Sequence, residues 1–181
     1  MIAHEFSVPA RDLDAAGASF RFPIRAHWLR GALEGTNVGP GATDGELEVR
    51  LSKSGRDVIV RGKFTAELSV ECARCLQPTR IVVREPLSAL LVPTADLSSG
   101  PASDEDEVTP DQADVIPYDG DTVVLDDFVR DELLLGVPMI PLCSESCPGI
   151  RPQTSPESAS PAIDAIDPRL SPLLRLKKNT T

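Results

Sequence analysis

Apolar and polar residues alternate most regularly between residues 46 and 92. From Phe64 to Cys72 every second residue is apolar and the residues between them are polar or charged, as expected of an antiparallel strand with one solvent-facing side. A similar but shorter alternation predicts a strand at 20–26. The remaining pattern predicts further sheet structure, with strands at 46–51, 57–72 and 80–91, a turn at 52–56, and a strand connection at 72–79.

A helical spacing of apolar residues follows in the second half of the chain. Leu125, Phe128, Val129 and Leu133 recur at the spacing of one helix face. Asp126 can cap the start of this helix, whereas Gly136 and the nearby Pro138 predict its end.

The predicted elements define a single α+β domain. Its core is an antiparallel sheet or partial barrel with one main packed helix, and a disordered acidic insert and a short C-terminal helix at 168–178 accompany it. The expected organisation, in chain order, is a β-rich part at 1–92, a flexible acidic insert at 93–114, the helix and second cysteine pair at 115–150, and a Pro/Ser-rich tail with a short basic helix at 151–181.

Composition adds two constraints. Aromatic residues make up only 4% of the 181 residues, so the core must consist mainly of Val, Leu, Ile and Ala. The net charge is −10, and the acidic excess lies in the second half, which leaves residues 1–92 nearly neutral and able to approach nucleic acid.

The chain has no apolar run of membrane-spanning length and no signal-peptide pattern, so we expect a cytoplasmic protein without a membrane partner.

Two close cysteine pairs are the strongest chemical signal. Cys72 and Cys75 form a Cys-x-x-Cys motif, and Cys143 and Cys147 form a second pair with three residues between them. Both spacings suit thiolate ligands of one tetrahedral zinc ion, and four thiolates leave no free coordination position. The sequence therefore favours a structural zinc site. One alternative is that the cysteines are simply packed, with partial or no metal. The other is a reversible disulfide, although no thioredoxin-like βαβ context surrounds the first pair.

Other enzyme signatures are not found in the sequence. The two histidines, His4 and His27, lack a matching nucleophile and acid, and the sequence has neither a phosphate-binding Gly-Lys-Ser/Thr loop nor a dinucleotide fingerprint. We therefore expect a protein that is not an enzyme and has no small-molecule substrate.

Basic residues cluster around the predicted hairpin, where they could contact phosphates. Because Arg74 and Arg80 flank the first cysteine pair, they stand out slightly among surface arginines. The candidate nucleic-acid contacts are Arg74, Arg80, Arg84, Arg61 and Lys63.

These motifs, in their order, resemble the YceD family of bacterial large-ribosomal-RNA accumulation proteins. The resemblance covers roughly residues 15–178 and rests on 68–78, which hold Cys-Ala-Arg-Cys-Leu, on 129–138, and on 141–150 with the second pair. Asp167-Pro168-Arg169-Leu170 heads a short basic segment, as in the family. The resemblance implies a cytoplasmic factor for large-subunit ribosomal RNA, with metal and nucleic acid as suspected ligands.

The resemblance leaves two questions open. The partner is either large-subunit ribosomal RNA or a basic ribosomal protein docked by the acidic insert, and a thiol redox protein is a third interpretation. Many family members also have a further Cys-x-x-Cys-Gly where this chain has Arg151 and Thr154. Either the metal uses Cys72, Cys75, Cys143 and Cys147 alone, or this member has weakened or lost its site.

Overall fold

The structure is a computed structural model that describes residues 4–97, 115–119 and 121–150. The described residues through Gly149 belong to one compact unit. Its elements, in chain order, are β1 (Ser7–Pro9), η1 (Ala10–Asp12), β2 (Ala18–Ile24), α1 (Ala26–Ala32), β3 (Val38–Pro40), β4 (Gly45–Ser54), β5 (Asp57–Glu71), β6 (Pro78–Pro93), α2 (Thr94–Leu97), β7 (Val115–Tyr118), β8 (Thr122–Val124) and α4 (Asp126–Leu135).

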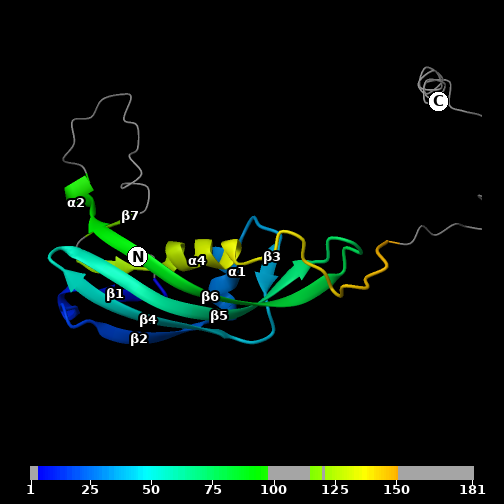
Figure 1. The fold of residues 1–181 in the computed structure, drawn as a ribbon, viewed down its shortest axis with the longest axis horizontal. Coiled ribbons are helices and arrows are strands. Elements are labelled where there is room, and N and C mark those ends of the chain that lie inside the picture. The colour runs from blue at the N-terminus through cyan, green and yellow to red at the C-terminus, as the bar shows by residue number, and fades with distance from the viewer. Residues whose placement is uncertain (1–3, 98–114, 120, 151–181) are drawn as a thin grey trace, which may run out of the picture. The chain divides into compact units, whose positions relative to one another are not determined.

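One open, curved sheet dominates the architecture (Figure 1). Its strand order is β2-β4-β5-β6-β7, and β3 pairs with the part of β5 that β4 does not reach. Every pair in this sheet is antiparallel except β6 with β7, which is parallel. A separate two-stranded sheet joins β1 to β8. The predicted α+β class with an antiparallel sheet is confirmed, and among the described residues the sheet does not close into a barrel.

The β4–β5 hairpin is tighter than the sequence pattern predicted. Ser54 pairs with Asp57, so only Gly55 and Arg56 form the turn. Gly55 has a φ of 65°, a conformation that glycine adopts without steric cost. The expected five-residue turn at 52–56 was therefore too long, because Ser52 to Ser54 still belong to β4.

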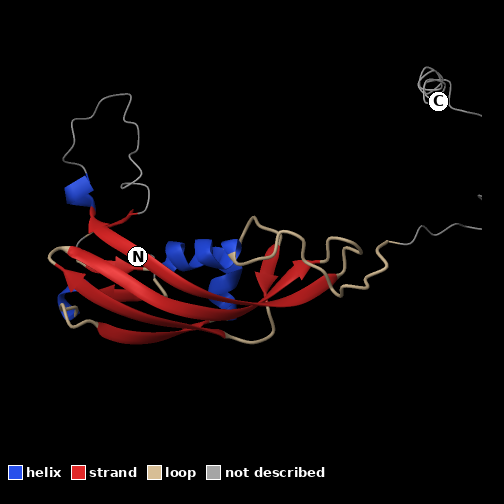
Figure 2. Ribbon diagram, in the orientation of Figure 1, coloured by secondary structure: helices blue, strands red, loops and turns tan. Residues whose placement is uncertain are grey.

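The core lies between the inner face of the sheet and the helices. Figure 2 shows α1 and α4 on one side of the main sheet, and the Arg130 Nε–H of α4 donates to the Ala32 carbonyl of α1 at 2.6 Å. The predicted alternation in β5 is confirmed, because its even-numbered residues are buried apart from Gly62. On α4, Val129 and Leu133 are fully buried.

Helix α1 is an element that the sequence pattern missed. Residues 20–26 were expected to form one strand, but β2 ends at Ile24 and α1 starts at Ala26. With seven residues, α1 is too short to show a clear helical period. Tertiary contacts hold it instead, since its Trp28 packs edge-on against Phe6 with ring centroids 4.6 Å apart.

The Asp126 carboxylate links three separate parts of the chain. It accepts hydrogen bonds from the backbone N–H groups of Glu5 (2.9 Å) and Phe6 (3.1 Å) and from the Trp28 indole N–H (3.0 Å). Asp126 is the first residue of α4 and makes no side-chain cap there, because Leu125 occupies the cap position. The expected capping role was wrong, since the carboxylate serves long-range contacts.

The first five residues of the predicted flexible insert, 93–97, belong to strand β6 and helix α2. Pro93 still pairs with Tyr118 in the β6–β7 ladder, and the Thr94 hydroxyl donates to the Tyr118 carbonyl at 3.0 Å. These contacts hold Thr94–Leu97 as the short helix α2. The remainder of the predicted insert, the expected C-terminal helix at 168–178, and Arg151 and Thr154 lie outside the described residues. None of the described helices is long and apolar enough to cross a membrane.

Replacing Asp126 with alanine should destabilise the fold because it leaves three partly buried donors without their acceptor. We expect Asp126→Ala to lower the free energy of unfolding by about 2–4 kcal/mol. Urea denaturation followed by the fluorescence of Trp28, the single tryptophan, measures this loss. Asp127→Ala is the matched control, because Asp127 is exposed in the same helical turn and has no hydrogen bond or ion pair in the described part of the chain. Equal losses of unfolding free energy in both variants would show that Asp126 acts only through its negative charge at the start of α4, and not through its three hydrogen bonds.

Candidate metal centre

The first cysteine loop, residues 72–77, connects β5 to β6. Glu71 pairs with Pro78 as the last rung of the ladder. Within the loop, the Cys72 N–H donates to the Gln77 carbonyl and the Leu76 N–H donates to the Cys72 carbonyl, both at 2.9 Å. Leu76 has a φ of 60°, which is unusual for a bulky residue and marks a backbone held in place by its surroundings. The loop thus turns sharply enough to bring Cys72 and Cys75 onto the same side.

The second cysteine loop, residues 141–149, follows α4 and lies against the first loop. The Ala73 N–H donates to the Pro141 carbonyl at 2.8 Å, and the Cys147 N–H donates to the Ser144 carbonyl at 3.1 Å. Gly149 has a φ of 74° and passes close to the Arg74 carbonyl, which would lie 3.4 Å from a Cβ at this position. Backbone contacts therefore join two segments that are far apart in the sequence.

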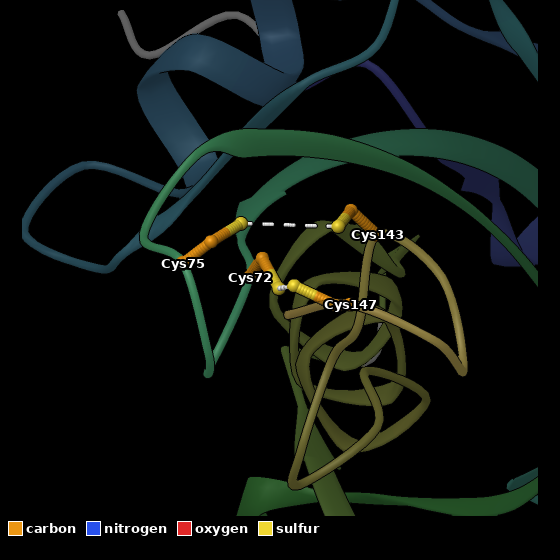
Figure 3. A group of neighbouring side chains, drawn as sticks. All are labelled: Cys72, Cys75, Cys143 and Cys147. Carbon is orange, nitrogen blue, oxygen red and sulfur yellow. Dashed lines mark hydrogen bonds between the residues drawn. The ribbon is translucent and has the colours of Figure 1, made fainter. Parts of the chain in front are cut away.

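The four cysteine sulfurs converge on one point (Figure 3). The Sγ atoms of Cys72 and Cys147 are 3.8 Å apart, as are those of Cys75 and Cys143, and all four lie within 4.8 Å of one another. Sulfurs bound at about 2.3 Å to a tetrahedral zinc ion are separated by about 3.8 Å. A disulfide needs about 2.05 Å between sulfurs, so the four cysteines are free thiols. Their arrangement is compatible with a zinc site.

The surrounding backbone favours a thiolate at Cys72. The N–H groups of Cys143, Cys75 and Arg74 hydrogen-bond to its sulfur and lower the pKa of the thiol to about 6. Conversely, the side chains of Cys147, Cys72 and Cys75 raise the pKa of Cys143 to about 12. For Cys75 the Gln77 N–H acts to lower the pKa, but desolvation and the Cys72 and Cys147 thiols raise it on balance. A cation between the sulfurs would offset the repulsion between neighbouring thiolates.

Burial is uneven across the site. Cys72 and Cys147 are buried, Cys75 is half-buried, and Cys143 is exposed. A divalent zinc ion bound here would offset part of the thiolate charge and link the two loops. Since four protein sulfurs complete a tetrahedron, no coordination position is left for a substrate, as in structural zinc sites. Four sulfurs from the described residues would complete such a tetrahedron without further cysteines at 151 and 154.

Arg74, one of the candidate RNA contacts, is exposed and also contacts the second cysteine loop. Its Nη1–H donates to the carbonyls of Glu145 (2.9 Å) and Cys147 (3.4 Å), both in the second cysteine loop. The guanidinium therefore fastens one cysteine loop to the other. Outer-shell hydrogen bonds of this kind orient metal ligands.

The other four candidate RNA contacts share one surface. Arg61 and Lys63 on β5 and Arg80 and Arg84 on β6 are exposed on the sheet side that faces away from the core. Arg50 on β4 lies directly opposite Arg61 on that same side but was not among the final sequence candidates. A two-residue turn at Gly55 and Arg56, had the sequence analysis predicted it, would have fixed the pairing of β4 with β5 and so placed Arg50 opposite Arg61.

The fold and the site together define a small α+β protein with a four-cysteine cluster at the tip of a long hairpin. Residues 60–177 match the family described as large ribosomal RNA subunit accumulation protein YceD. The chain belongs to this family, and the match includes all four cysteines. The resemblance inferred from the sequence motifs is thereby confirmed.

Curated relatives occur in mycobacteria and carry names without a functional description. Uncharacterized proteins of Mycobacterium bovis and Mycobacterium tuberculosis are 31% identical to this chain over 134 residues, which is 72% of the chain and 61% of the relatives. One from Mycobacterium leprae is 30% identical over 104 residues, or 58% of the chain and 44% of the relative. The chain thus spans less than two thirds of their length. No solved structure is significantly similar to it.

If the four sulfurs bind zinc, the protein purified without chelators should contain about one equivalent of zinc per chain. Elemental analysis by mass spectrometry measures this ratio. Cys72→Ser should lose the metal and melt at a lower temperature, because zinc binding and folding are coupled. Ser146→Ala, in the same loop as Cys147, should retain it. Less than about 0.2 equivalents in the wild type would count against the site.

Arg74 should contribute to metal affinity without being a ligand. Arg74→Met keeps an unbranched side chain but removes the guanidinium, so the second cysteine loop is held less firmly. We expect zinc affinity to fall roughly tenfold or more, as measured by competition with a chromophoric chelator. Arg80→Met is the control, since Arg80 contacts Glu67 and neither cysteine loop. Unchanged zinc affinity in Arg74→Met would show that the Arg74 guanidinium does not support metal binding.

Proposed function

We propose that this protein is a non-enzymatic factor that supports the accumulation of large-subunit ribosomal RNA by contacting that RNA directly. Family membership supports the role in large-subunit RNA. The observation that supports direct contact is the grouping of Arg61, Lys63, Arg80 and Arg84 on one side of the sheet. This solvent-facing side of β2, β4, β5 and β6 is called the outer face below.

The charge balance of the outer face suits a polyanion. Its cations are Arg21, Arg50, Arg61, Lys63, Arg80 and Arg84, and its acids are Glu46, Glu48 and Glu67, with Asp57 and Glu71 at the ends of β5. Arg61 and Arg84 form no ion pair within the described residues. The remainder of the protein carries the acidic excess, so this face is where phosphates would meet least repulsion.

Zinc has a structural role in this proposal. The ion would fix the tip of the β5–β6 hairpin to the segment after α4, and the outer face lies on the strands that end at this tip. A closed set of four sulfurs offers no position for a reacting group, which favours a protein that is not an enzyme. Robust dithiol oxidation, abolished by Cys72→Ser, would instead support the redox interpretation.

In-cell ultraviolet crosslinking of the tagged full chain tests direct contact. We expect discrete crosslinks in large-subunit ribosomal RNA. The double substitution Arg61→Ser/Arg84→Ser should reduce them roughly tenfold, because each lost phosphate contact weakens binding. Arg11→Ser/Arg30→Ser removes the same charge from η1 and α1, outside the outer face, and should leave the crosslinks unchanged.

Depletion of the protein separates RNA contact from protein contact. The ratio of large-subunit to small-subunit ribosomal RNA should fall and recover with the wild-type chain. A normal ratio after depletion would overturn the proposed function. A third outcome is a reduced ratio with only background crosslinking to RNA. If binding to a ribosomal protein then survives nuclease treatment, the partner is a basic ribosomal protein and not RNA.

A further inference from the structure

Positive charge on the outer face is concentrated at the end of the hairpin remote from the cysteines. One row of directly paired residues crosses four strands there: Ser19 of β2, Arg50 of β4, Arg61 of β5 and Ser88 of β6. We call these four residues the arginine row. Adjacent strands are about 4.8 Å apart, so the row spans about 14 Å of surface.

The two arginines of this row repel each other. Arg50 and Arg61 are direct cross-strand partners, an arrangement of like charges that destabilises a sheet unless an anion lies nearby. The arginine row contains no acid. Arg50 donates a hydrogen bond to the Ala16 carbonyl, whereas Arg61 has no hydrogen bond or ion pair in the described part of the chain.

The neighbouring rows do not neutralise this charge. On one side, Arg21 and Lys63 both contact Glu48, at 2.6 and 3.1 Å, and Arg21 also contacts Glu46 of the next row at 3.0 Å. With two cations and one carboxylate, that row keeps a net positive charge of its own. The hydrogen bonds of these cations, that of Lys63 most strongly, lower the pKa of Glu48 and keep it ionised. On the other side the row is uncharged, since it consists of Ser52, Ile59 and Leu90.

Shallow depressions flank the arginine pair. One, of about 560 Å³, is lined by Ser19, Arg21, Glu48, Arg50, Arg61 and Lys63, among others. A smaller one, of about 220 Å³, lies between Arg50, Ser52, Ile59 and Arg61. Hydroxyl and guanidinium donors therefore line hollows that can admit phosphate oxygens.

The cysteine end of the outer face is different. Arg80 lies 3.7 Å from the Glu67 carboxylate, and Arg74 is occupied by two backbone carbonyls. Glu71 adds a further exposed negative charge beside the first cysteine loop. An anion is therefore favoured at the arginine row over the cysteine loops, the reverse of the ranking that the sequence gave.

We propose that the arginine row binds the phosphodiester backbone of helical RNA. This inference rests on the proposed function and assigns its contact site and RNA class. The only aromatic residue lining these depressions is Phe20, which is half-buried and stacked on Phe22 with ring centroids 6.2 Å apart. Single-stranded RNA is usually held by bases stacked on exposed aromatic rings, whereas helical RNA is recognised through shape, phosphates and 2′-hydroxyls.

Fluorescence anisotropy with a labelled RNA hairpin and the zinc-loaded full chain tests the site. Arg61→Ser should weaken binding roughly fivefold to tenfold. It should also make the slope of log affinity against log salt concentration shallower by about one. Arg50→Ser should weaken it by at least as much. Arg30→Ser is the matched control, because it removes the same charge from α1, outside the outer face, and it should leave binding unchanged. Arg80→Ser removes the same charge at the cysteine end of the outer face, and its effect should be smaller than that of Arg61→Ser. Unchanged circular dichroism confirms folding.

The outcomes distinguish this inference from the proposed function. Wild-type protein that binds no RNA would overturn both. Binding that Arg80→Ser weakens as much as Arg61→Ser would overturn the arginine row and leave RNA contact intact. An oligouridine single strand that binds as tightly as the hairpin would overturn the assignment to helical RNA. Tighter binding of the hairpin, lost selectively in Arg50→Ser and Arg61→Ser, establishes the site.

Discussion

The β5–β6 ladder runs without interruption from Val58 paired with Leu91 to Glu71 paired with Pro78, and the other parts of the fold are built on it. One edge of β5 receives β4 and then β3, while β6 adds β7 at its far end. The ladder also separates two kinds of chemistry. Thiols lie at its tip, and the arginine row crosses it near the opposite end. Because both strands are continuous, an ion bound at the tip would restrain the strands that present the cations.

A long hairpin has a cost, since its tip extends beyond most of the core. The structure offsets this with contacts from the segment after α4: the Ala73–Pro141 hydrogen bond, the two hydrogen bonds of Arg74, and the convergence of four sulfurs. Thiolates held this closely repel each other, so a divalent cation suits the geometry and the charge. The zinc interpretation and the RNA proposal are therefore linked through the rigidity of one hairpin.

Much of the fold follows from local pattern. The alternation in β5 exposes one face, and the helical spacing of Leu125, Val129 and Leu133 predicts α4, including its end at Gly136. The short elements β1, β3, β7, β8 and α1 were missed, because three to seven residues rarely show a period. Asp126 was misassigned for a related reason. Capping is a local rule, whereas its partners Glu5, Phe6 and Trp28 lie about a hundred residues away.

The sequence by itself determined the sheet-rich fold class, the family, and the four cysteines as one candidate ligand set, because spacing and periodicity are local properties of a chain. Only the tertiary structure decided that Cys72 faces Cys147 and Cys75 faces Cys143, and that Arg74 contacts carbonyls. It also decided which cations lack an acid, since charge balance on a sheet depends on neighbours across strands. Arg61 and Arg80 look equivalent along the chain, and strand register alone places one beside Arg50 and the other near Glu67.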